Sequence, residues 1–153
     1  MPDVDPVVTI QMPSFELERN IPPSEVTLDL LRVLQRVLLD DVAPRSSGSR
    51  QGKLKFDLSI VDSFGEESIA RIEDYRPLLL PDTTSAISIR YISPFEAAPE
   101  ITVRVAFSLQ RHMSRFQVQV AGDAARDVAL GVADLLTRVL EPQRRAHSFF
   151  HLD

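Results

Sequence analysis

Regular alternation of apolar and polar residues along positions 100–110 is the feature that most constrains how this chain can fold. Successive side chains of a β-strand point to opposite faces of its sheet. The stretch therefore predicts a strand with one face against a core and the other toward solvent. Its inward set is Ile101, Val103, Val105, Phe107 and Leu109, and its outward set includes Thr102, Arg104, Ser108 and Gln110.

Weaker alternation predicts five more strands, over residues 7–17, 54–60, 67–75, 86–93 and 116–120. Pro13 breaks or bulges the first of them, because proline has no N–H to donate to a ladder. Asp62-Ser63-Phe64-Gly65 predicts a hairpin turn, since Asp accepts a backbone N–H ahead of it and Gly tolerates positive φ. A proline-bracketed extended connection, residues 76–82, follows the third strand.

Two amphipathic helices flank these strands. Residues 25–41 carry an apolar stripe at helical spacing and follow Ser24, a good N-cap. Residues 124–141 carry a second stripe, begin after Gly122-Asp123 and are predicted to end before Pro142. The stripes are Leu30, Leu31, Leu34, Val37 and Leu38 in the first helix, and Val128, Val132, Leu135, Leu136 and Val139 in the second.

The element order β-α-β-β-β-β-β-α predicts an α+β two-layer sandwich. Sequential hairpins favour a largely antiparallel sheet of five to six strands, and both amphipathic helices then cover one face of it. A length of 153 residues favours one domain. We assign residues 1–142 to this domain and residues 143–153 to a C-terminal tail.

Composition excludes several kinds of chemistry and favours the cytoplasm. The chain has no cysteine, which excludes disulfides, thiolate metal ligands and cysteine nucleophiles. No apolar run approaches the roughly 18–20 residues that span a bilayer. The acidic first residues are unlike the basic start of a signal peptide.

Motifs for catalysis and metal binding are missing from the sequence. There is no Gly-x-Ser-x-Gly elbow and no glycine-rich phosphate loop. His147 and His151 have a spacing that zinc sites use, but only Asp153 lies nearby as a third ligand. We therefore expect no catalytic residue, no metal ion and no cofactor. Three acidic pairs are interpreted as solvated charge: Asp40-Asp41, Glu66-Glu67 and Glu73-Asp74.

Two apolar segments lie outside the predicted strands and helices. One is Leu78-Leu79-Leu80 in the proline-bracketed connection, and the other is Phe149-Phe150 in the predicted tail. Such side chains either cover an open edge of the core in the same molecule or meet a partner, since exposed apolar patches often mark contact sites. The sequence therefore predicts a non-enzymatic protein-interaction or self-association module, whose partner is another protein or a second copy of the chain.

Two alternatives remain open at this point. The first is a small-molecule enzyme or ligand-binding domain whose site is assembled from scattered residues. The second is a weak nucleic-acid binder, which the net charge of −5 disfavours, as it also disfavours binding to anionic membranes. The arginines that would serve nucleic-acid binding are Arg111, Arg115, Arg138, Arg144 and Arg145.

Overall fold

The computed structural model describes residues 12–22, 25–47, 53–109 and 113–150, the last nine of these by their backbone alone. The strands are β1 (Ser14–Asn20), β2 (Lys55–Asp62), β3 (Gly65–Ile69), β4 (Ala86–Ile92), β5 (Glu100–Ser108) and β6 (Arg115–Ala121). The main helices are α1 (Leu28–Arg36) and α2 (Ala125–Phe150). Shorter helical segments are η1 (Val37–Val42), η2 (Ala43–Arg45) and η3 (Ile72–Asp74).

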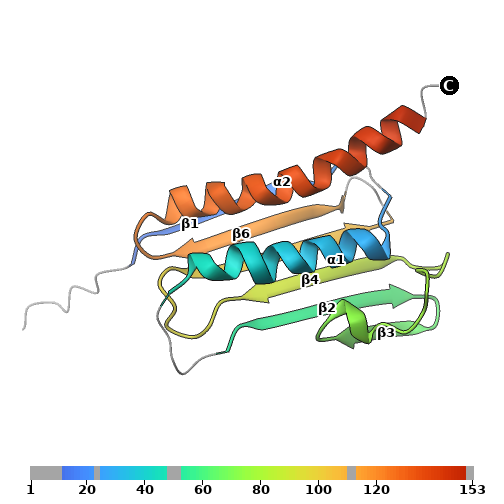
Figure 1. Ribbon diagram of the computed structural model, residues 1–153, viewed down its shortest axis with the longest axis horizontal. Helices are drawn as coiled ribbons and strands as arrows, with labels where there is room; N and C mark the ends of the chain where they lie inside the picture. The colour runs from blue at the N-terminus through green and yellow to red at the C-terminus, as the bar shows by residue number, and fades with distance from the viewer. Residues whose placement is uncertain (1–11, 23–24, 48–52, 110–112, 151–153) are drawn as a thin grey trace, which may run out of the picture.

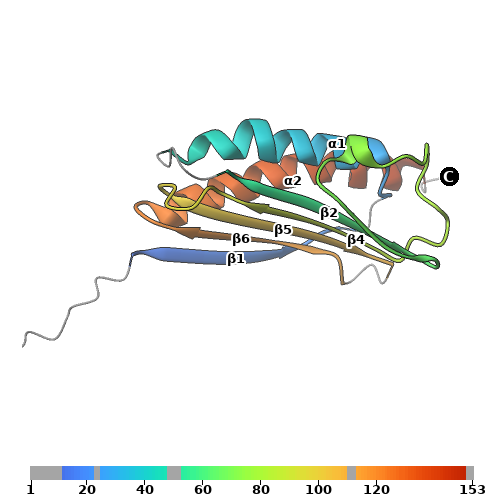
Figure 2. The same cartoon turned by 90° about the horizontal axis from the view of Figure 1, so that it is seen from below.

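The six strands form one sheet in the order β1-β6-β5-β4-β2-β3, and every neighbouring pair is antiparallel. Both α1 and α2 lie on the same face of this sheet, and the opposite face is open (Figures 1 and 2). The α+β two-layer sandwich predicted from the sequence is therefore confirmed.

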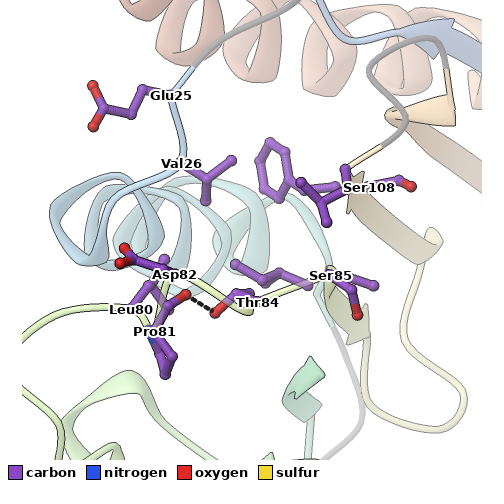
Figure 3. A pocket seen from close by; sticks show the side chains of 12 residues that line it. Glu25, Val26, Leu80, Pro81, Asp82, Thr84, Ser85 and Ser108 are labelled. Atoms are coloured by element: carbon purple, nitrogen blue, oxygen red, sulfur yellow. Dashed lines mark hydrogen bonds between the residues drawn. The ribbon is translucent and has the colours of Figure 1, made fainter. Parts of the chain in front are cut away.

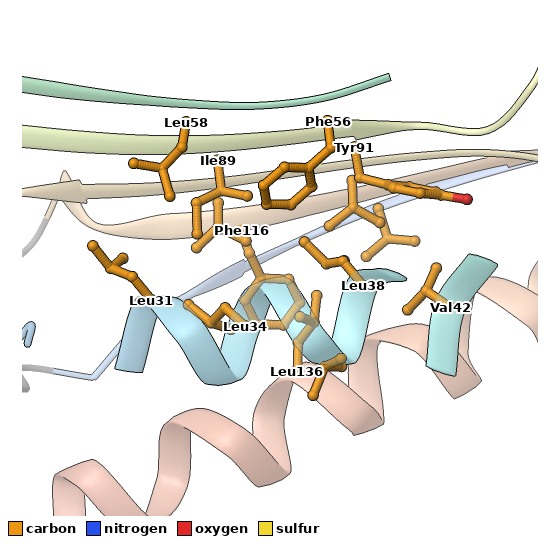
Figure 4. Packing of buried hydrophobic residues seen from close by; sticks show 14 of the residues in the cluster. Leu31, Leu34, Leu38, Val42, Phe56, Leu58, Ile89, Tyr91, Phe116 and Leu136 are labelled. Carbon is orange, nitrogen blue, oxygen red and sulfur yellow. The ribbon is translucent and has the colours of Figure 1, made fainter. Parts of the chain in front are cut away.

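The core is the layer between the sheet and the two helices. In the central strands every second side chain is buried, as the alternation in the sequence predicts. Leucines of α1 and η1 and side chains of α2 pack against these strand residues (Figure 4). Fully buried members include Leu31, Leu34 and Leu38 from α1 and η1, Leu58, Ile89 and Val103 from the sheet, and Val132 and Leu136 from α2.

The first helix was predicted over residues 25–41, but α1 begins at Leu28 and its α-helical part ends at Arg36. Thr27 is its N-cap, because the Thr27 hydroxyl oxygen accepts a hydrogen bond of 3.1 Å from the Leu30 N–H. Ser24, the predicted cap, lies outside the described residues. After Arg36 the chain continues through a π-helical turn and a short 3-10 turn that ends at Arg45. Pro44 fits this last turn, since the first residues of a helix need no N–H donor.

Helix α2 extends through Pro142 to Phe150, so the prediction that it ends at Glu141 is wrong. A proline inside a helix loses one hydrogen bond and costs roughly 3 kcal/mol, but it does not always end the helix. The residues around it are mostly good helix formers: Glu141, Gln143, Arg144, Arg145 and Ala146. Part of the predicted tail is therefore helical.

Two strand predictions were too long. Leu109 was predicted to face the core, but it follows the end of β5 and is 69% exposed. The third strand was predicted to run to Tyr75, but β3 ends at Ile69 and residues 72–74 form the 3-10 turn η3.

Gln35 of α1 fixes the turn η3 against the helix layer. The buried Gln35 side-chain oxygen accepts a 2.8 Å hydrogen bond from the Ile72 N–H, and its amide nitrogen donates to both Glu73 oxygens at 3.0 and 3.1 Å. This amide holds the pKa of the Glu73 carboxyl below its ordinary value of 4.5. Because the pKa is lower in the folded than in the unfolded state, the interaction stabilises the fold at pH values above the unfolded-state pKa. This contribution is lost as the pH falls through the folded-state pKa.

We expect Gln35→Met to lower the free energy of unfolding by about 1–3 kcal/mol, because it leaves the buried Ile72 N–H without an acceptor. Urea denaturation at pH 7 measures this loss. Arg36→Met on the exposed side of the same turn is the control, with an expected change within about 0.5 kcal/mol. Equal stability of the two variants would contradict the role of Gln35.

Candidate protein-contact surface

One end of the sheet carries exposed apolar side chains from several connections. Strands β2 and β5 end there, and β3, β4 and β6 begin there. Leu78 and Leu79, in the connection before β4, are 92% and 79% exposed. We call this surface the apolar end and define it by Phe64, Leu78, Leu79, Leu109 and Met113, all of which are exposed.

The connection that carries the leucines is held on both sides. Before it, Tyr75 is buried in the core. After it, the N–H and hydroxyl of Thr84 both donate to the Pro81 oxygen, at 3.0 and 2.7 Å. The Ser85 N–H then donates to the Val61 oxygen at 2.8 Å, and the Leu109 N–H donates to the Ser85 oxygen at 3.0 Å. The exposed leucines are therefore presented by a segment with fixed ends.

A pocket of about 340 Å³ opens at the apolar end, and Figure 3 shows the side chains around it. Its walls come from residues 25–26 before α1, from the stretch between residues 80 and 87, and from residues 107–109 at the end of β5. Leu80 lines this pocket, whereas Leu78 and Leu79 lie outside it. The three leucines predicted as contact residues are thus split between an exposed surface and the pocket beside it.

The pocket combines apolar walls with hydroxyl and carboxyl groups. Val26, Leu80, Ile87 and Phe107 supply the apolar surface, and the described lining includes no histidine, cysteine, lysine or arginine. The Thr84 hydroxyl already donates to the Pro81 oxygen. Apolar walls with a few polar groups are the composition of a surface that can bind a small ligand.

Phe149 and Phe150, the other predicted contact residues, lie at the end of α2. Figure 1 shows that α2 runs toward the same end of the molecule as the β2–β3 hairpin. The end of α2 therefore points toward the apolar end. Contact by the two rings themselves remains a prediction.

The arginines predicted for nucleic-acid binding come from both layers of the fold. Arg115 lies on the open sheet face and pairs with Glu18 at 3.0 Å, whereas Arg138 is exposed on α2 in the other layer. Arg144 and Arg145 belong to the last turns of α2, and Arg111 lies outside the described residues. Of the predicted arginines, the two whose side chains the structure describes, Arg115 and Arg138, thus lie in different layers.

Within the described part of the chain, no group of three or more His, Cys, Asp or Glu side chains could hold a metal ion. His147 belongs to α2, whereas His151 lies outside the described residues.

The Asp62–Gly65 segment is the predicted hairpin turn. The Phe64 N–H donates to the Asp62 carboxylate at 2.8 Å, and Gly65 has a φ of +144°.

Comparisons with protein-family models, with curated proteins and with solved structures find no match for this chain. Across the residues that the structure describes, neither helix combines the length and the hydrophobicity that crossing a bilayer requires.

Sequence reasoning missed three residues of the apolar end. Phe64 occupies a two-residue hairpin loop, where a ring has no core to enter, and this position was a usable signal. Leu109 continues the inward phase of β5 and therefore resembles a core residue. No sequence signal marks Met113.

Tyr91 is a buried polar group that the pocket does not include. Its side chain is fully buried on β4 beneath the first helical segment (Figure 4), and burial raises the pKa of its hydroxyl. Among the described residues this hydroxyl has no hydrogen-bond partner. A buried donor without a partner is a cost to the folded state.

We expect Tyr91→Phe to leave the free energy of unfolding unchanged or to raise it by up to about 1 kcal/mol, because it removes an unpaired buried hydroxyl. Chemical denaturation of the two proteins measures the difference. A destabilisation of about 1 kcal/mol or more would show that the hydroxyl makes a hydrogen bond.

Proposed function

We propose that this chain is a non-enzymatic protein-interaction module that binds another protein or a second copy of itself through the apolar end. The observation that carries the proposal is the exposure of Leu78 and Leu79 on a segment held at both ends. The absence of cysteine suits a reducing compartment, and we place the module in the cytoplasm.

The energetics of the exposed leucines support a contact role. Full burial of a leucine side chain is worth roughly 1.5–3 kcal/mol relative to exposure. Binding also costs conformational entropy, but that cost is smaller for a segment whose ends are already fixed. The leucines therefore offer apolar area for a partner at a low cost of ordering.

A ligand-binding domain is the second candidate, and the pocket of about 340 Å³ is the observation that favours it. Small-molecule sites are mostly apolar clefts of roughly 300–1,000 Å³ with a few polar groups. A thermal-shift screen of metabolites tests this candidate. Loss of a shift in Val26→Trp, whose larger side chain would narrow the pocket from the segment before α1, would assign the ligand to this pocket.

We expect the double variant Leu78→Ser/Leu79→Ser to lose its protein partner while its free energy of unfolding changes by less than about 0.5 kcal/mol, because both side chains are exposed. If the partner is a second copy of the chain, light scattering measures its loss as a fall in mass from dimer to monomer. Quantitative crosslinking in the native cell measures loss of a different protein.

Phe95→Ser is the matched control, since Phe95 is 78% exposed in the β4–β5 connection at the opposite end of the sheet. The control is expected to retain the partner. If the leucine variant keeps the wild-type mass and the wild-type crosslinks, the apolar end is not the contact surface.

Truncation after Pro142 tests the phenylalanine pair. Each buried ring is worth about 1.5–3 kcal/mol, against roughly 1–2 kcal/mol for each residue that becomes ordered. We expect either a lower melting temperature at unchanged mass, which means docking in the same molecule, or a change from dimer to monomer. Phe149→Ser/Phe150→Ser in the full chain should reproduce the effect, and no effect in either protein would remove this contact from the proposal.

A further inference from the structure

Strand β1 forms one edge of the sheet and is open to pairing. It runs over Ser14–Asn20, and no described strand lies on its outer side (Figure 1). It holds no proline and its register with β6 is unbroken by a bulge. The opposite edge, β3, spans only Gly65–Ile69. Long regular edges are templates for another strand, whereas short ones are protected from such pairing.

Two hydrogen bonds determine which backbone groups of β1 face outward. The Gly122 N–H donates to the Pro13 oxygen at 2.7 Å, and the Ile21 N–H donates to the Ser114 oxygen at 2.9 Å. Hydrogen-bonded pairs alternate along an antiparallel ladder, so the odd-numbered residues of β1 bond to β6. The N–H and C=O groups of Ser14, Glu16, Glu18 and Asn20 therefore point away from the sheet and are available to a further strand.

The side chains of these four residues lie on the open face of the sheet and are exposed. Phe15 and Leu17 point the other way and are partly buried against the core beneath α2. Arg126 of α2 lies over the Phe15 ring at 5.4 Å. An added strand would thus meet acidic side chains on one face and apolar side chains on the other.

Charge disfavours pairing of β1 with a second copy of itself. A two-fold antiparallel pair that joins the outward backbone groups places Glu16 opposite Glu18, Glu16 opposite Glu16, or Glu18 opposite Glu18. Any other such register pairs no more than three residues. Like charges directly opposite each other across a ladder are destabilising. The two glutamates therefore act against a β1–β1 dimer.

The same glutamates favour a basic partner. Glu16 accepts a hydrogen bond from the neutral Gln117 amide, and it forms no ion pair with the residues that the structure describes. Glu18 pairs with Arg115 at 3.0 Å, but both side chains are about half exposed, and such surface pairs are weak. An arginine or lysine opposite each glutamate would form a favourable cross-strand pair.

We propose that β1 binds an extended segment of another protein with the order basic, apolar, basic, which adds a seventh strand antiparallel to β1. Its basic side chains lie opposite Glu16 and Glu18, and the apolar side chain between them lies opposite Leu17. This surface shares no residue with the apolar end, so the inference goes beyond the function proposed above.

The probe is the labelled peptide fluorescein-Gly-Gly-Thr-Val-Arg-Val-Arg-Val-Thr-amide, titrated with the full chain and followed by fluorescence anisotropy. A peptide with glutamate in place of both arginines is the charge control. N-methylation of both arginine amides removes the two central donors that face β1, opposite Glu16 and Glu18, whereas N-methylation of the central valine leaves every donor that faces β1 in place. We expect the arginine peptide to bind at least about tenfold tighter than the glutamate peptide. The arginine-methylated peptide should lose binding and the valine-methylated one should keep it.

Variants of the chain assign the site. Glu16→Lys/Glu18→Lys should reverse the preference between the two peptides, and Asp40→Lys/Asp41→Lys, with the same charge change on the helix layer, should not. Glu16→Pro should bind more weakly than Glu16→Gln, because both lose the charge but only proline loses the outward N–H. The variant Glu16→Thr/Glu18→Thr should form a dimer, measured by light scattering, because it lacks the two charges that oppose β1–β1 pairing. Circular dichroism of every variant checks the fold.

Two outcomes would overturn the proposal. If the arginine-methylated peptide binds as tightly as the unmodified one, the contact is electrostatic and adds no strand. If the two lysine variants behave alike, the peptide does not bind at β1. Leu78→Ser/Leu79→Ser should bind the peptide as the wild type does, which separates this proposal from that for the apolar end.

Discussion

The packing of α1 and α2 on one face of the sheet is the interaction on which the rest of the structure depends. Each helix has one apolar stripe and the sheet has one apolar face, so neither layer is stable in water alone. Their contact buries Leu34 and Leu136 completely against strand residues such as Ile89. This single interface orients the central strands β2, β4, β5 and β6, because a shift of one residue would move a strand's whole apolar set to the open face. The surfaces left for binding are then the ends and the edges of the sheet.

The periodicity of the sequence predicts this architecture well, because the interface between sheet and helices requires most strands and both helices to carry an apolar face of their own. The boundaries follow contacts that are distant in sequence, and there the prediction fails. Residues 72–74 leave the strand pattern because Gln35, far back in the chain, holds their backbone. Leu109 continues the alternating pattern of β5, but it lies beyond the last residue of that strand. Pro142 is a breaking signal whose cost the helix tolerates.

The candidate surfaces differ in how much of them the sequence reveals. Leu78 and Leu79 stand out because prolines bracket three leucines outside any periodic element. The grouping of these leucines with Phe64 and Leu109 depends on which strand ends lie together, and therefore on strand order. The role of Glu16 and Glu18 depends on strand order as well, since in the sequence they are two polar positions of an ordinary alternating strand. Only their place on an unpaired edge turns them into a determinant of pairing.

The two proposed surfaces rest on different physical forces and therefore differ in specificity. Apolar area at Leu78 and Leu79 is non-directional, so it supplies affinity but discriminates weakly between partners of similar shape. The β1 edge supplies directional backbone hydrogen bonds, and its acidic residues add a charge requirement that salt screens. The glutamates also oppose the pairing of identical edges, which any long open strand invites. Acidic side chains at these positions thus favour a different chain over a second copy, and the same carboxylates that protect the edge from self-pairing define the charge of the strand that can occupy it.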